Sequence, residues 1–482
     1  MSSCSKLGLC LPLSLAFAAL ALAPLTACEA DSNKGGELTP DSGVFVVDGS
    51  GGDGGGGGDG SVASECVPPT KGPTMHGGGS ISLPDEVWTA DGSPHILPFD
   101  TTIYKKVTVE PCAEVLIADG KTLTVRGSLV AEGTASKRIH IGGKDAGKPF
   151  RTITTVGAGP TSIRLAYVTI DGGGSLTNTA IYNTGVLTPQ GSSATVTQDT
   201  LFVDNVTIQG SPTSGIVLSG GAGFAPGSNA LTIKGVASHP IVITPRSVGG
   251  IPVGTYTGNA KDQILLPTGS GNETITETTT LHDRGVPYLV GHDLNAGDLR
   301  VDTIVGNPPI VLTIEAGVTM RFKKGGVFYT AVASGTAPAR ASMVAVGTAA
   351  KPIVFTSDEA APAAGDWLGL RFGEMPTATT RLDYVRVEYA GGGSSAGSGS
   401  CLYTPAVGNN EGAIRITGRP PSQFITNTTI VDSLLHGIDR GWRSDDPEID
   451  FLPTNTFTRV GACRQTVAPT AGNVCPDPVP CE

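Results

Sequence analysis

The densest group of residues that could do chemistry lies near the C-terminus and comprises His436, Asp439, Arg440, Trp442 and Arg443. An imidazole, a carboxylate and two guanidinium groups could bind a polar substrate, and the indole could stack against a sugar ring. In the alternative interpretation, the stretch is a turn at the edge of the last strands and Trp442 covers apolar surface. We favour that alternative and retain the group as a candidate ligand surface.

Asp366 and Trp367 form a second candidate ligand surface, because exposed aromatic side chains often mark binding sites. In the alternative interpretation Trp367 is a packing residue, because the matching region of the first copy reads Pro149-Phe150. Asp445 and Asp446 are paired carboxylates of the kind used in acid–base chemistry, but a solvated acidic loop explains them better. The chain has no glycine-rich phosphate loop, so we expect no cofactor.

Residues 1–27 have the layout of a secretory signal, with Lys6 before an apolar stretch that ends in small residues. Leu25-Thr26-Ala27-Cys28 resembles the bacterial lipobox, which implies that Cys28 begins the mature protein and carries lipid. Glu29 follows in place of the Asp typical of inner-membrane retention. We therefore expect a lipid-anchored protein of the bacterial outer membrane, facing the periplasm or the cell surface.

Six of the nine cysteines remain once Cys4, Cys10 and Cys28 are set aside: Cys66, Cys112, Cys401, Cys463, Cys475 and Cys481. An even number in an oxidising compartment predicts disulfides, and the absence of a CxxC pair argues against zinc.

Composition narrows the classes of partner. The formal net charge is −11, so the chain should repel nucleic acid. Residues 28–65 include the run GSGGDGGGGGDGS, which cannot bury apolar area and should be a flexible linker.

From about residue 80 onward, short β-branched runs alternate with Gly, Asn, Asp and Pro, and no long segment after the signal has helical apolar spacing. The mature chain should therefore be all-β. Asp119-Gly120 between two runs is a hairpin signal, so a string of β-sandwich domains is the alternative fold.

An internal repeat favours a solenoid. Residues 131–137 match residues 345–351 at an offset of 214, and residues 165–168 match residues 382–385 at an offset of 217. The offset only grows along the chain, as expected when insertions leave a coil as loops. We assign residues 66–275 to a first copy with its connector, 276–462 to a second copy, and 463–482 to a Cys/Pro-rich C-terminal cap.

Five stretches carry a resemblance to a known fold: 312–322, 347–357, 365–370, 382–393 and 427–438. They resemble right-handed parallel β-helix proteins of the pectin-lyase-like superfamily, in particular bacterial surface lipoproteins of uncharacterised function. The resemblance implies a parallel β-helix in two degenerate copies. The polysaccharide-cleaving motifs of that superfamily are not found as a set.

A structural or binding module, with a carbohydrate or envelope glycan as partner, is therefore our first functional hypothesis. A polysaccharide lyase or glycoside hydrolase is the second, and a scaffold for cell–cell contact is the third. Because a β-helix must cover both of its ends, we expect Cys66–Cys112 to close the N-terminal end. Cys401–Cys463 and Cys475–Cys481 should close the C-terminal end.

Overall fold

The computed structural model describes residues 65–77, 79–81, 85–157, 161–175, 184–192, 197–268, 274–291, 296–303, 307–331, 339–393, 411–442 and 449–468. Several residues singled out above lie outside these ranges: Cys28, Cys401, Arg443, Asp445, Asp446, Cys475 and Cys481. All of the described residues belong to one unit, Ser61–Glu482. In these ranges no helix is long and apolar enough to cross a membrane.

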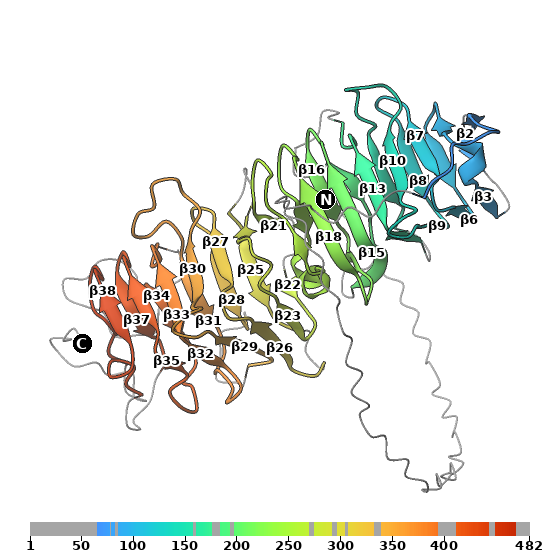
Figure 1. Ribbon diagram of the computed structural model, residues 1–482. Coiled ribbons are helices and arrows are strands. Elements are labelled where there is room, and N and C mark those ends of the chain that lie inside the picture. The colour runs from blue at the N-terminus through green and yellow to red at the C-terminus, as the bar shows by residue number, and fades with distance from the viewer. Residues whose placement is uncertain are drawn as a thin grey trace, which may run out of the picture. The chain divides into compact units, whose positions relative to one another are not determined.

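One sheet of fourteen strands runs through both copies (Figure 1): β2 (Gly79–Ile81), β5 (Thr101–Ile103), β8 (Thr122–Val125), β11 (Thr152–Thr155), β14 (Gly185–Thr188), β16 (Ser214–Leu218), β19 (Ile241–Ile243), β21 (Ile264–Leu266), β24 (Tyr288–Val290), β27 (Thr319–Phe322), β30 (Ile353–Ser357), β33 (Val385–Glu388), β36 (Thr429–Val431) and β38 (Thr456–Thr458).

A thirteen-stranded sheet belongs to the first copy: β1 (Thr74–Met75), β3 (Glu86–Trp88), β4 (His95–Leu97), β6 (Lys106–Val109), β7 (Glu114–Ile117), β9 (Ser128–Glu132), β10 (Ile139–Gly143), β12 (Ser162–Ala166), β13 (Val168–Asp171), β15 (Gln198–Gln209), β17 (Ala222–Phe224), β18 (Asn229–Lys234) and β20 (Gly254–Thr255). The long strand β15 pairs with both β12 and β13 and thereby joins two faces into this one sheet.

Two smaller sheets complete the second copy. The six-stranded sheet contains β22 (Thr274–Ile275), β25 (Asp298–Val301), β28 (Val327–Thr330), β31 (Gly369–Phe372), β34 (Gly412–Ile416) and β37 (His436–Arg440). The five-stranded sheet contains β23 (Thr279–Leu281), β26 (Ile310–Ile314), β29 (Ala341–Val346), β32 (Arg381–Asp383) and β35 (Ile425–Thr426). The short 3-10 helices η1 (Ala90–Gly92) and η3 (Pro245–Gly250) lie between strands.

The strands follow from the alternating sequence pattern. In β8, Leu123 and Val125 are buried, whereas Thr122 and Thr124 are partly exposed. Such alternation places one face of each strand in the core, and the buried side chains of all coils form one long apolar cluster.

The pairing pattern decides between a coil and a hairpin. β5, β8 and β11 pair in parallel, and so do β4, β7 and β10, so each strand pairs with the strand three places later in the chain. β7 and β8 flank Asp119-Gly120 but lie in different sheets, so this dipeptide forms a turn of the coil. The parallel β-helix expectation is confirmed, and the β-sandwich alternative is wrong.

Corresponding strands of the two copies match in local geometry. Tyr167 and Tyr384 both have φ of 50°, and Asn205 and Asn427 have φ of 53° and 47°. Asn and a few other residues tolerate this left-handed region, which bends the chain from one face of the coil to the next.

Corresponding strands nevertheless lie on different faces. An offset of 205 carries β8 onto β28, yet β8 lies in the fourteen-stranded sheet and β28 in the six-stranded one. The same offset carries β7, of the first-copy sheet, onto β27 of the fourteen-stranded sheet. Each strand of the second copy therefore lies one face further round the coil than the corresponding strand of the first copy. The change occurs at β21, which pairs with β19 on one side and β24 on the other.

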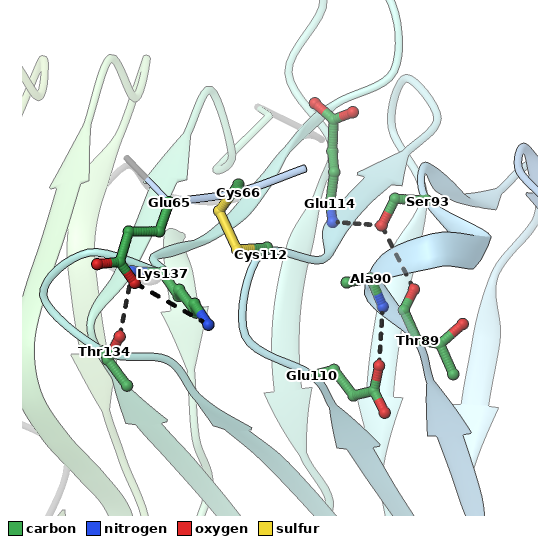
Figure 2. The surroundings of a disulfide bond; sticks show 10 residues. All are labelled: Glu65, Cys66, Thr89, Ala90, Ser93, Glu110, Cys112, Glu114, Thr134 and Lys137. Atoms are coloured by element: carbon green, nitrogen blue, oxygen red, sulfur yellow. Dashed lines mark hydrogen bonds and ion pairs between the residues drawn. A yellow bond between two sulfur atoms is a disulfide. The ribbon is translucent and has the colours of Figure 1, made fainter. Parts of the chain in front are cut away.

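A disulfide bond fixes the start of the described chain (Figure 2). Cys66 and Cys112 are bonded, with 5.4 Å between their Cα atoms, as the sequence predicted. Beside it, the Glu65 amide donates to the Ser136 carbonyl and the Lys137 ammonium lies 4.0 Å from the Glu65 carboxylate. Cys463 is also disulfide-bonded, whereas its expected partner Cys401 lies outside the described ranges.

Candidate functional site

Four neighbouring strands of the first copy share a short pattern that ends in glycine. Gly143 is the last residue of β10. Directly after β13, β15 and β18 come Gly172, Gly210 and Gly235, in that order. Gly172, Gly210 and Gly235 have φ of 72°, 69° and 64°, values that favour glycine. The turns stack from coil to coil, since a Cβ added to Gly235 would lie 3.7 Å from the Gly210 nitrogen.

This stack of glycine turns lines an open cleft of about 470 Å³. No side chains from the turn glycines fill the space, so backbone groups reach its surface. Asp145, Lys148 and Asp171 also line the cleft and contribute two carboxylates and an ammonium group. Its volume falls within the range of small-molecule sites, about 300–1,000 Å³.

A chain of polar side chains leads into the cleft across three coils. The His140 Nδ1 lies 3.1 Å from the Glu114 carboxylate, and Nε2 lies 3.0 Å from Asp171 Oδ2. His140 is in register with Glu114, but Asp171 is in register with Gly142, so the ring reaches Asp171 diagonally. A Cβ at Gly142 would come within 2.9 Å of that ring.

The arrangement orients Asp171 at the edge of the cleft. A neutral imidazole can donate to only one of the two carboxylates, whereas an imidazolium donates to both. All three side chains are about two-fifths exposed: His140 42%, Glu114 41% and Asp171 38%. With Oδ2 facing His140, the other carboxylate oxygen of Asp171 can accept a hydrogen bond from a ligand.

The family comparison concerns the second copy. Residues 294–403 match the model of the pectate-lyase-like β-helix domain. The chain folds as a parallel β-helix. No curated protein and no solved structure matches it. The cleft of this β-helix lies in the first copy, outside the residues that the family model matches.

Asp366 and Trp367 are interior residues of the β-helix. Trp367 is 0% exposed, stacks on Phe322 with ring centroids 4.2 Å apart, and donates from Nε1 to the Glu388 carbonyl at 2.7 Å. Asp366 Oδ2 accepts from Ser357 Oγ at 2.8 Å and thereby fixes the adjoining turn. The hypothesis of an exposed sugar-stacking surface here is wrong, because the indole is needed to fill the core.

The C-terminal candidates are also buried. Trp442 packs edge-on against Phe451, and Asp439 Oδ1 accepts from Thr466 Oγ1 at 3.2 Å. Arg440 is 0% exposed and donates to the carbonyls of Thr466 and Ile449. These contacts join the last coils of the β-helix. The sequence favoured this structural role over a ligand surface. The described members of this group form no exposed ligand surface.

His436 lies in the same region and is buried. Its Nδ1 accepts a hydrogen bond from the Cys463 amide at 3.2 Å, and burial lowers the pKa of the imidazole to about 4. The ring therefore stays neutral at ordinary pH and acts as a fixed acceptor at the end of the core.

The cleft was missed in the sequence, although a signal for it was present. Residues 168–172, 206–210 and 231–235 read VTIDG, VTIQG and LTIKG. The repeated Thr and Ile alternate between the outer and inner faces, and the fourth residue varies among polar types at the edge of a glycine turn. Repetition of that pattern on stacked coils predicts a polar groove beside the turns.

Across the described residues, no group of three or more His, Cys, Asp or Glu side chains is arranged to hold a metal ion.

Proposed function

We propose that this protein is a lipid-anchored cell-envelope β-helix whose first-copy cleft binds a glycan. The observation that carries the proposal is the open cleft that Asp145, Lys148 and Asp171 line beside glycine turns. Carboxylates accept hydrogen bonds from sugar hydroxyls and an ammonium group donates to sugar oxygens. The turns carry no side chains, so a sugar ring can approach the backbone closely.

Removal of the cleft charges should abolish most of this binding. We expect Asp171→Asn and Lys148→Ala each to weaken binding by about tenfold, the effect of one lost charge-assisted hydrogen bond. A glycan panel with the purified protein, followed by titration of the best ligand, measures this. Glu132→Gln is the matched control, since Glu132 pairs with Arg164 on β9 and β12, away from the cleft. If all three variants bind the glycan with equal affinity, the glycan binds outside the cleft.

A polysaccharide-cleaving enzyme is the second candidate, and the same cleft favours it. Asp145, Asp171 and Lys148 line the same open cleft. Glu114 is connected to Asp171 through His140, which contacts both carboxylates. Ionisable groups that converge in a groove are what general acid–base cleavage requires. Release of reducing ends or unsaturated uronates above a heat-killed control, abolished by Asp171→Asn, would establish catalysis. Binding without release supports the binding module.

The anchoring part of the proposal rests on Leu25-Thr26-Ala27-Cys28. We expect Cys28→Ser to lose metabolic palmitate label and to move from the membrane fraction to the soluble fraction, because the lipid is removed with the thiol. Cys66→Ser is the control, since it removes a cysteine of the Cys66–Cys112 disulfide but leaves the lipobox intact. Unchanged label and fractionation in Cys28→Ser would exclude the anchor.

A further inference from the structure

His140 lies between two carboxylates on neighbouring coils, and one of them belongs to the cleft. Its Nδ1 lies 3.1 Å from Glu114 Oε1, and its Nε2 lies 3.0 Å from Asp171 Oδ2. Asp171 lines the cleft, whereas Glu114 of β7 and His140 of β10 lie on the two preceding coils. In the described part of the chain, His140 is the side chain that hydrogen-bonds the Asp171 carboxylate. The orientation of Asp171 in the cleft therefore depends on His140.

The geometry around this ring suits a protonated imidazole. Both ring nitrogens face an acceptor, and only an imidazolium carries a proton on each nitrogen. A neutral ring that donates to Glu114 through Nδ1 turns the lone pair of Nε2 toward Asp171, and the two acceptors repel each other. Histidine changes its charge between about pH 5 and about pH 8. The hydrogen bond that holds Asp171 is therefore fully formed in mild acid, whereas at higher pH only one tautomer of the ring makes it.

The neighbouring cations are engaged with other groups. Arg138, directly before β10, donates from Nη2 to two backbone carbonyls. Lys144, directly after β10, has its ammonium group 3.5 Å from the Asp145 carboxylate. In the described structure neither cation pairs with Glu114 or Asp171. The imidazole is therefore the group that can neutralise these two carboxylates when it gains a proton.

We propose that His140 is a proton-dependent clamp on Asp171 that makes ligand binding in the cleft tighter in mild acid. This inference rests on the proposed function of the cleft. When the imidazolium holds Asp171 Oδ2, the other carboxylate oxygen is already oriented for a ligand hydroxyl, so binding no longer has to order that side chain. His140 is a positioning residue, because it lies outside the lining of the cleft and acts through Asp171.

The binding test uses the full-length protein with cellohexaose, chitohexaose and maltohexaose, which are uncharged and do not titrate. For the wild type we expect the affinity to rise about fivefold from about pH 8 to about pH 5.5, a typical coupling between two sites. His140→Gln cannot gain a proton and should bind with the same affinity at both pH values. His282→Gln is the matched control, because that ring faces the Glu315 carboxylate in the second copy, and it should keep the wild-type pH dependence.

Glu114→Gln distinguishes a clamp from a general effect of pH. Its amide N–H can donate to Nδ1 of His140, so a neutral ring keeps its own proton on Nε2 and holds Asp171 without further protonation. We expect this variant to bind at about pH 8 as tightly as the wild type binds at about pH 5.5. Weak binding by Glu114→Gln at the higher pH, or an unchanged pH dependence in His140→Gln, overturns the inference.

A measurement without ligand separates the clamp from the proposed function. A double-mutant cycle of His140→Gln and Asp171→Asn, followed by urea denaturation, gives the coupling between these two side chains. We expect a larger coupling at about pH 5.5 than at about pH 8. If that result comes with no binding of the three oligosaccharides, the clamp is present and the glycan proposal fails for uncharged sugars. Equal coupling at both pH values overturns the clamp, whether or not a glycan binds.

Discussion

Trp367→Ala should lower the free energy of unfolding by about 3–5 kcal/mol, the usual cost of truncating a buried aromatic residue. The indole is fully buried, stacks on Phe322 with an interplanar angle of 5°, and donates to the Glu388 carbonyl. Alanine would leave a cavity between coils and an acceptor without its donor. Urea denaturation followed by far-ultraviolet circular dichroism measures the change.

Trp367→Phe is the matched control, because the first copy has Phe150 in the corresponding region and that ring is also fully buried. Phenylalanine keeps the stacking and loses the hydrogen bond, so it should cost clearly less than alanine. A cost for Trp367→Ala below about 1 kcal/mol would contradict a core role and reopen the ligand-surface hypothesis.

Acid should destabilise the folded protein through buried histidines. Burial lowers the pKa of His436 to about 4, and burial together with His95 lowers the pKa of His76 to about 4. Between that value and about 6.5 the unfolded chain binds protons that the folded chain does not, so stability falls as pH falls. For His436 the loss from about pH 7.5 to about pH 5 should be about 2 kcal/mol.

His436→Asn tests this, since the Asn side-chain oxygen can accept from the Cys463 amide but does not titrate. Its unfolding free energy should fall less between the two pH values than that of the wild type. His282→Asn is the control, because His282 is partly exposed and faces the Glu315 carboxylate. An unchanged pH dependence in His436→Asn would mean that other groups cause the acid sensitivity.

The coil itself was predictable because its determinants are local. Alternating β-branched residues set the buried face of each strand, and the repeated Asn205 and Asn427 mark matching bends. The one-face shift between the copies was not predictable, since strands of equal sequence pattern fit any face of the coil. Only the pairing of β21 with both β19 and β24 reveals it.

The candidate site was predictable only in part, for a similar reason. Strand alternation places Arg371 and Asp439 on the outer face, where charged residues normally meet water, and it does not tell that this face is covered. The sequence therefore favoured Trp442 as a cover of apolar surface, but it did not predict that Asp439 is fully buried beside it. The cleft depends on what glycine leaves open, and an absent side chain is a weak signal in a chain with 68 glycines.

The Cys66–Cys112 bond also determines how the molecule carries mechanical load. The segment after Glu65 starts beside Ser136 and runs back to Asp91, where the Lys71 amide is bound. Tension applied on the N-terminal side of Glu65 passes through Cys66 to Cys112, which lies in the turn between β6 and β7. It acts on Cys112 first and on β1 afterwards. Force therefore enters at an interior coil and is shared among several parallel hydrogen-bond ladders. While the disulfide is intact, tension from that side cannot unzip the first coil from its end.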